Sequence, residues 1–167
     1  MKPCCKYLCL VLLILSISVK SQENLDSLWG VWNNSSQLDS SRFSALSKII
    51  KAEPDSAFVY YQLMHDLAKK KNKKKWLSKA LIEQGLFDYG HGDYDSSLES
   101  FKKCLALNLK RKDAFEEVSR LYLLIGNTYF QKDDLEKALV YYKNCLKIRE
   151  EIGDKNGISK VFNNIGI

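Results

Sequence analysis

Apolar residues recur every three or four positions along most of the chain, and this spacing marks one face of an α-helix. The clearest example is Leu121–Glu151, which contains two such faces joined by the short turn Lys132–Asp133. The recurring positions in this stretch are Tyr122, Ile125, Gly126, Tyr129, Ala138, Tyr142 and Cys145. A single helical hairpin cannot bury both of its apolar faces, so the pattern predicts further hairpins on either side.

Turn and capping residues divide the rest of the chain into helices of similar length. We expect helices at about 40–51, 54–70, 76–89, 94–109, 113–131, 134–152 and 158–167, after a short amphipathic segment at 24–32. The lysine run Lys69–Lys75 and the segment Gly153–Gly157 are expected to link successive helices. No stretch alternates with a period of two for long enough to predict a strand, so the expected fold class is all-α.

Alignment of the hairpins with one another shows a repeat. Gly85, Gly126 and Gly166 stand 41 and 40 residues apart, and a large apolar residue precedes each of them by four positions. The glycines would let two helices approach closely, and aromatic side chains would fill the space between hairpins. The residues expected to pack the repeats are Leu81, Gly85, Phe101, Tyr122, Gly126, Tyr129, Ala138, Tyr142 and Gly166.

The sequence YLLIGNTY at 122–129, followed by ALVYY at 138–142, resembles the W-x2-L-G-x2-Y…A-x3-F pattern of the tetratricopeptide repeat family. The resemblance covers about 40–167 and implies a right-handed α-α superhelix whose first helices line a concave groove that binds peptides. The chain departs from the family in its period, which is 40–41 rather than 34 residues. It also has Asp88 where the family has an aromatic residue, Ser97 where the family has alanine, and no glycine in its first hairpin.

These features predict six consecutive regions. A signal peptide at 1–21 is followed by an N-terminal helical segment and linker at 22–39 and a degenerate first hairpin at 40–75. Two repeats at 76–112 and 113–155 follow, and 156–167 begins a further repeat. Because the chain stops inside an expected helix, we expect the sequence to be a fragment whose reading frame continues beyond Ile167.

The N-terminus has a basic start, an apolar run at Leu8–Val19 and a small-residue site before Gln22, which is the order found in signal peptides. The apolar run has 12 residues, whereas a membrane-spanning helix needs about 20. This favours a cleaved signal, and the alternative is a retained anchor, since Lys20 interrupts the cleavage region. The protein is therefore expected to be exported, to the periplasm or outside the cell.

Charge and cysteine content bear on the class of binding partner and on whether a disulfide is expected. The formal charge of +6 falls to +3 without the three lysines of the signal segment, so it points only weakly to nucleic acid or anionic membrane. Cys104 and Cys145 occupy equivalent places in neighbouring repeats, where helices pack about 8–10 Å apart. A disulfide needs Cα atoms within about 7 Å, so we expect both residues to be unpaired and buried.

A narrower resemblance concerns the context of the repeats in a longer protein. The export signal, the PDSA sequence of the first hairpin and the stretch IGDKNGISKVFNNIG are together similar to the exported N-terminal repeat regions of bacterial signalling proteins. Those proteins include sensor histidine kinases, LuxR-type regulators and class III nucleotide cyclases. The resemblance implies a sensory or scaffolding arm, and the alternative is a free-standing secreted scaffold, including one that self-associates.

The resemblance also predicts a partner-binding surface on the first helices of the repeats. Its residues are Lys79, Ile82, Leu86, Tyr89, Arg120, Leu123, Asn127, Phe130, Lys160 and Asn163. Lys79, Arg120 and Lys160 recur at the repeat period and would suit an acidic partner, although a solvated face of a lysine-rich chain is the simpler explanation. The run Lys69–Lys75 could attract anionic lipid or nucleic acid, and its simpler explanation is an exposed link.

No catalytic or metal-binding pattern is present in the sequence. His65 and His91 are isolated, and no Cys or His cluster has ligand spacing. Gly90-His91-Gly92 is a turn rather than a phosphate-binding loop. We therefore expect a protein or peptide partner, with no enzymatic activity, cofactor or nucleic acid, and membrane contact only through a retained anchor or a span beyond this sequence.

Overall fold

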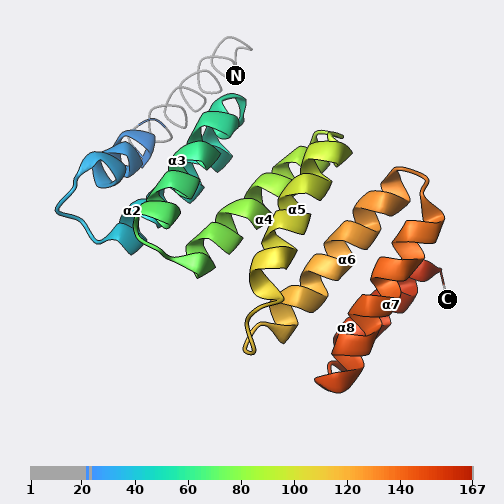
Figure 1. Ribbon diagram of the computed structural model, residues 1–167. Coiled ribbons are helices and arrows are strands. Elements are labelled where there is room, and N and C mark those ends of the chain that lie inside the picture. Colours follow the sequence, from blue (N-terminus) through green and yellow to red (C-terminus); the bar gives the residue numbers. More distant parts are fainter. Residues whose placement is uncertain (1–21, 23, 167) are drawn as a thin grey trace, which may run out of the picture. The chain divides into compact units, whose positions relative to one another are not determined.

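The computed structural model describes residues 22 and 24–166, and every regular element within them is a helix (Figure 1). This confirms the all-α prediction. The expected signal segment and Ile167 lie outside the described residues. The chain divides into two compact units, 1–64 and 65–167, and the boundary falls within α3 (Ala57–Lys70).

The first unit contains a helix at 24–33, followed by α2 (Asp39–Ala52) and the single 3-10 turn η1 (Pro54–Ser56). Helix α2 buries one apolar face, which is formed by Phe43, Ala45, Leu46, Ile49 and Ile50. Arg42 joins this helix to the preceding one, because its Nε donates a hydrogen bond to the carbonyl oxygen of Trp32 at 2.8 Å. Its guanidinium also lies 5.1 Å from the Trp32 ring centroid.

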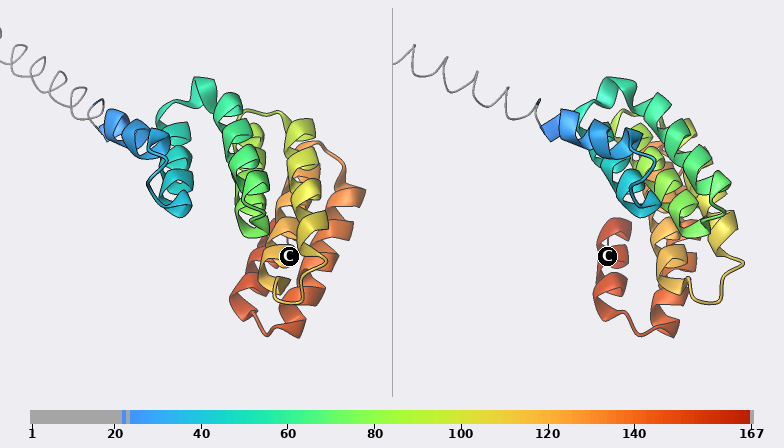
Figure 2. Two further views of the ribbon diagram at one scale, coloured as in Figure 1. Left: turned by 60° about the vertical axis from the view of Figure 1, so that its left-hand side comes forward. Right: turned by 90° about the vertical axis from the view of Figure 1, so that its left-hand side faces the viewer.

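The second unit is a stack of helices in which each helix lies antiparallel to its neighbours in the chain (Figure 1, Figure 2). Its complete helices are α4 (Lys74–Gly90), α5 (Tyr94–Asn108), α6 (Phe115–Gln131), α7 (Leu135–Glu151) and α8 (Lys155–Ile165). The lysine run was predicted as a link, but α3 ends at Lys70 and α4 begins at Lys74, so most of the run is helical. Lysine is a good helix former, and the reversal needs only Asn72, whose φ is 50°.

The turns that precede α5, α7 and α8 share one capping arrangement. Each turn ends in an aspartate whose side chain accepts a hydrogen bond from the backbone N–H three residues later. These aspartates are Asp93, Asp134 and Asp154, with bonds of 3.1, 3.1 and 2.8 Å. The residues just before them have positive φ and are Gly92 at 80°, Asp133 at 59° and Gly153 at 72°. The turns α4–α5 and α6–α7 are thus built alike.

A continuous core runs through the second unit. Its buried members are Leu81, Leu98, Phe101, Cys104, Leu105, Ala114, Val118, Leu121, Ile125, Tyr129, Ala138, Tyr142, Cys145 and Val161. Both cysteines are buried and unpaired. Burial raises the pKa of the Cys104 thiol to about 11 and also raises the pKa of Cys145, so both are poor nucleophiles.

Two buried glycines allow an aromatic ring of the second helix to touch the first helix. A Cβ added to Gly85 would lie 2.5 Å from the Phe101 ring, and one added to Gly126 would lie 2.7 Å from the Tyr142 ring. Gly166 does not repeat this contact. It caps the C-terminal end of α8 with a φ of 85°, and a Cβ there would meet nothing within 4 Å.

Candidate functional site

The predicted partner-binding residues lie on α4, α6 and α8, which are the first helices of successive hairpins. The exposed members are Lys79, Leu86, Arg120, Phe130, Lys160 and Asn163, and the half-buried ones are Ile82, Tyr89, Leu123 and Asn127. Leu86 is 38% exposed and Phe130 is 48% exposed. Each of these two helices therefore leaves a large apolar side chain open to solvent near its C-terminal end.

Asn127 connects three helices through its side chain. Its Oδ1 accepts hydrogen bonds from Tyr142 Oη on α7 at 2.9 Å and from Asn164 Nδ2 on α8 at 2.8 Å. Because both bonds end on the oxygen, the orientation of the amide is fixed and its Nδ2 carries the remaining donors. Asn164 was not among the predicted residues, and only its place next to Asn163 could have suggested it.

Three basic residues recur at the repeat period, Lys79, Arg120 and Lys160, and we call them the basic ladder. They differ in their surroundings. Lys79 forms an exposed ion pair with Glu83 at 3.7 Å within α4, and such pairs contribute little to stability. Arg120 and Lys160 are exposed on α6 and α8, and no ion pair to either is within 4.0 Å among the described residues. The ladder is thus accessible, but its first member is already partly neutralised.

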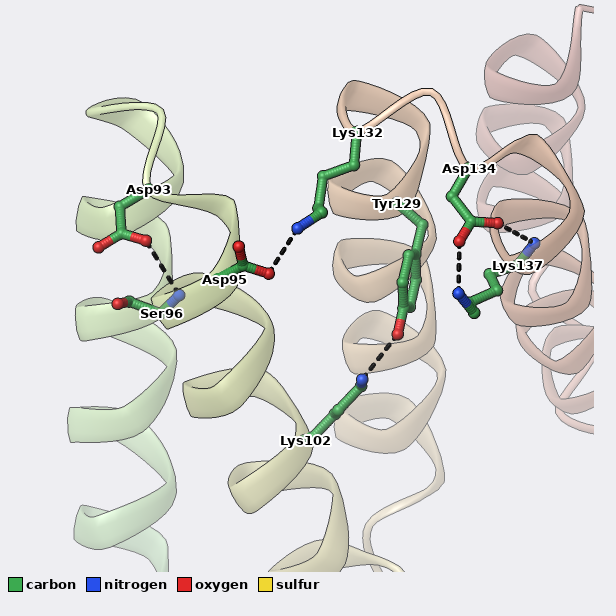
Figure 3. Close-up of polar contacts among 8 residues, drawn as sticks. All are labelled: Asp93, Asp95, Ser96, Lys102, Tyr129, Lys132, Asp134 and Lys137. Carbon is green, nitrogen blue, oxygen red and sulfur yellow. Dashed lines mark hydrogen bonds and ion pairs between the residues drawn. The ribbon is translucent and has the colours of Figure 1, made fainter.

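A second polar cluster ties α5, α6 and α7 together (Figure 3). Lys102 Nζ on α5 donates to Tyr129 Oη on α6 at 2.7 Å, and Lys137 Nζ on α7 lies 5.3 Å from the same ring. The ring of Tyr129 also stacks on that of Tyr141, with centroids 5.5 Å apart. Lys132 at the end of α6 pairs with Asp95 at the start of α5. Tyr129 is therefore held from two neighbouring helices.

This geometry agrees with the comparison to known families. Residues 119–151 match the family model of the tetratricopeptide repeat. The match covers most of α6, the turn and all of α7. Comparison with the curated proteins gives no match. Tetratricopeptide repeats generally mediate protein–protein interactions, and all-helical folds of this family are typically non-enzymatic scaffolds.

Outside the matched stretch, the hairpin α4–α5 keeps the tetratricopeptide glycine and ring but has Asp88 where α6 has Tyr129. Burial, followed by the nearby Asp93 carboxylate, raises the pKa of Asp88 to about 6. Its Oδ2 is buried without a hydrogen-bond partner. A half-buried carboxylate thus stands where the tetratricopeptide pattern has an aromatic side chain.

Other kinds of site have little support in the described part of the chain. No group of three or more His, Cys, Asp or Glu side chains there could hold a metal ion. None of the helices it contains is long and apolar enough to cross a membrane. The first unit has an open hollow of about 380 Å³ beside α2, whose lining includes Leu28, Ala45 and a single charged residue, Lys48.

Proposed function

We propose that the chain is a protein-binding module that holds a peptide or protein segment against α4, α6 and α8. The observation that carries the proposal is the exposure of Leu86 and Phe130 on the first helices of two successive hairpins. Exposed apolar side chains with polar groups nearby are typical of protein interfaces. The oriented amide of Asn127 adds a fixed hydrogen-bond donor for a partner's carbonyl or carboxylate oxygen.

The proposed biological setting is the exported sensory or scaffolding arm of a longer bacterial signalling protein. It is supported by the signal-like N-terminal sequence and by the family match within 119–151. The second candidate is a free-standing secreted scaffold, which the same N-terminal sequence would favour equally. The reading frame beyond Ile167 separates them. A membrane span followed by a kinase, cyclase or DNA-binding module favours the first, and a capping helix followed by a stop codon favours the second.

The binding face can be tested without a known partner. Phage-displayed random peptides are selected on the purified chain, and the affinities of the selected peptides are measured by fluorescence anisotropy. We expect L86A/F130A to weaken binding at least tenfold, because these two side chains supply the exposed apolar area. L139A is the matched control, since Leu139 is also an exposed leucine but lies on the second helix α7.

The contribution of charge is tested with the same peptides. If the basic ladder takes part, R120E/K160E weakens the binding of acidic peptides more than that of neutral ones. Equal binding by the wild type and R120E/K160E would leave the ladder as a solvated face. Selected peptides that bind L86A/F130A as tightly as the wild type would contradict the proposed face itself.

A further inference from the structure

Two neighbouring connections at one end of the second unit form a strongly basic surface. The connection α3–α4 and the connection α5–α6 lie on the same, lower side of the helices in Figure 1. Their exposed cationic residues are Lys69, Lys70, Lys71, Lys73, Lys74, Lys75, Lys110 and Lys112. We call these residues, together with the flanking Leu109 and Phe115, the basic face.

An ion pair holds the two connections side by side. Lys75 Nζ at the start of α4 lies 3.7 Å from Asp113 Oδ2, and Arg111 Nη2 lies 3.0 Å from the same oxygen. The hydrogen bond from Arg111 keeps the pKa of Asp113 below its usual value. Asp113 is thus shared by two cations, and together with the exposed Glu116 it offsets only part of the charge of the eight exposed lysines.

The backbone of both connections is well defined. Asn72 adopts a left-handed conformation with φ 50°, and Lys73 N–H donates to the Ala68 carbonyl at 2.9 Å. In the second connection Arg111 Nη1 donates to Asn108 Oδ1 at 2.7 Å, and Ala114 is fully buried. The lysines therefore project from helix ends and from hydrogen-bonded turns.

Two large apolar side chains flank the lysines of the second connection. Leu109, which follows α5, is 57% exposed, and Phe115, which begins α6, is 51% exposed. Neither is needed to close the core, since buried Leu105 and Val118 provide the adjacent apolar contacts. Exposed apolar side chains among lysines are the arrangement by which proteins rest on lipid bilayers, with lysines at the headgroups and apolar groups below them.

The third connection on this side has a different character. The connection between α7 and α8 has exposed Glu150 and Glu151 next to the exposed Ile152, one exposed cation, Lys155, and an ion pair between Arg149 and Asp154. The positive charge is therefore confined to two adjacent connections and is not a general property of this end of the unit.

We propose that the basic face docks on the surface of an anionic phospholipid membrane. The lysines would contact the headgroup phosphates, and Leu109 and Phe115 would enter the boundary between headgroups and acyl chains. The lipid surface is favoured over nucleic acid because an exposed leucine beside the lysines has no role in contacting phosphates or stacking on bases. The signal-like N-terminus also implies that the chain meets a membrane during export.

This surface is separate from the proposed partner-binding face. Leu86 lies twelve residues after the start of α4, which is about 18 Å along the helix. Phe130 lies fifteen residues after Phe115 on α6, which is about 22 Å. The geometry therefore permits a peptide and a membrane to be bound at the same time, and the two proposals can fail independently.

The first test compares the binding of the full chain to sedimenting vesicles of phosphatidylcholine with and without phosphatidylglycerol. Removal of one lysine near an anionic membrane costs about 1 kcal/mol, which weakens partitioning about fivefold, so K73Q/K112Q is expected to lose about 30-fold. K143Q/K147Q removes two exposed lysines from α7 and is expected to change partitioning little. Every variant retains the N-terminal apolar run, and binding to pure phosphatidylcholine measures its contribution.

The second test reports on the position of Phe115 directly. Phosphatidylglycerol vesicles should shift the fluorescence of F115W to the blue relative to the wild type, because the indole enters the bilayer interface. F130W places the same probe at an exposed site on the opposite end of α6 and should not shift. Equal partitioning of K73Q/K112Q and K143Q/K147Q would overturn the proposal. A second outcome would also overturn it: the chain binds duplex DNA, K73Q/K112Q abolishes that binding, and vesicles leave the fluorescence of F115W unshifted.

Discussion

The hairpins α4–α5 and α6–α7 use one backbone plan with two different sets of side chains. Both place a buried glycine under an aromatic ring, Gly85 under Phe101 and Gly126 under Tyr142. Both reverse direction through a positive-φ residue followed by a capping aspartate. The two hairpins thus share the close approach of their two helices, which a glycine allows and a larger residue does not.

The two hairpins differ at equivalent positions near the ends of their helices, where side chains of different chemistry occupy the same place. Near the end of the first helix, the second hairpin has Tyr129, bonded to Lys102 and stacked on Tyr141. The first hairpin has Asp88 there, whose Oδ2 has no hydrogen-bond partner. Near the end of the second helix, buried Arg149 pairs with Asp154, whereas buried Asn108 bonds to Ser78 Oγ at 2.9 Å. The family match covers only the hairpin with the aromatic residue.

The largest expected effect tests what the hairpins have in common. G85A and G126A should each lower the free energy of unfolding by about 2–3 kcal/mol, because the added methyl group must displace a packed ring. Urea denaturation followed by circular dichroism measures this loss. G90A is the control, since a Cβ at Gly90 would meet nothing within 4 Å and the helix should gain slightly. A loss in only one hairpin would contradict the shared plan.

A smaller effect tests the difference at Asp88. Its folded pKa of about 6 lies above the ordinary value of 3.8, so the folded state binds the proton more tightly than the unfolded state. The Asp88 contribution therefore lowers stability as the pH rises from about 4 to about 6. D88N should remove this slope and raise the free energy of unfolding at pH 7.5 by about 1 kcal/mol, after allowance for the partial exposure of the side chain.

The pH series for D88N is compared with D95N, which alters an exposed aspartate paired with Lys132. D95N should cost at most about 0.5 kcal/mol, and because it retains Asp88 it should retain the Asp88 contribution to the pH dependence. If the wild type and D88N have parallel pH dependence, the carboxylate of Asp88 is not desolvated in the way that its burial implies.

The smallest expected effect concerns the two turns. Asp133 occupies the left-handed conformation that Gly92 provides in the first hairpin, with φ of 59° and 80°. D133G should relieve this strain and raise the free energy of unfolding by about 0.5 kcal/mol, less than the strain itself because glycine is also freer in the unfolded chain. G92A should cost about 1 kcal/mol. Thermal unfolding of both variants would show opposite shifts, and shifts of the same sign would contradict the equivalence of the turns.

Much of the fold could be predicted because its main constraints are local. The predicted helix at 94–109 is observed at Tyr94–Asn108, since the capping Asp93 and the apolar spacing together define it. The repeat of Gly85 and Gly126 was visible at a separation of 41 residues. Gly166 lies at the same period, yet it caps a helix, because spacing alone does not say whether an aromatic ring will cover a glycine.

The site was less predictable because it depends on contacts between elements. The amide of Asn127 is oriented by Tyr142 and by Asn164, which is 37 residues away on α8. The basic face depends on Lys75 reaching Asp113 from another connection. Neither pair follows the repeat period, so neither could be read from the alignment of the hairpins. The repeat period did place the ten predicted residues on the first helices, but six of them are exposed and four are half-buried.

The most direct test of the common plan is a nuclear Overhauser spectrum of the folded chain with labelled glycine, phenylalanine and tyrosine. The structure predicts strong cross-peaks from the α-protons of Gly85 to the Phe101 ring and from those of Gly126 to the Tyr142 ring, and none from Gly90 to either ring. Absence of the Gly85 cross-peaks beside strong ones for Gly126 would contradict the account, because α4–α5 would then not be a second copy of the hairpin at 119–151.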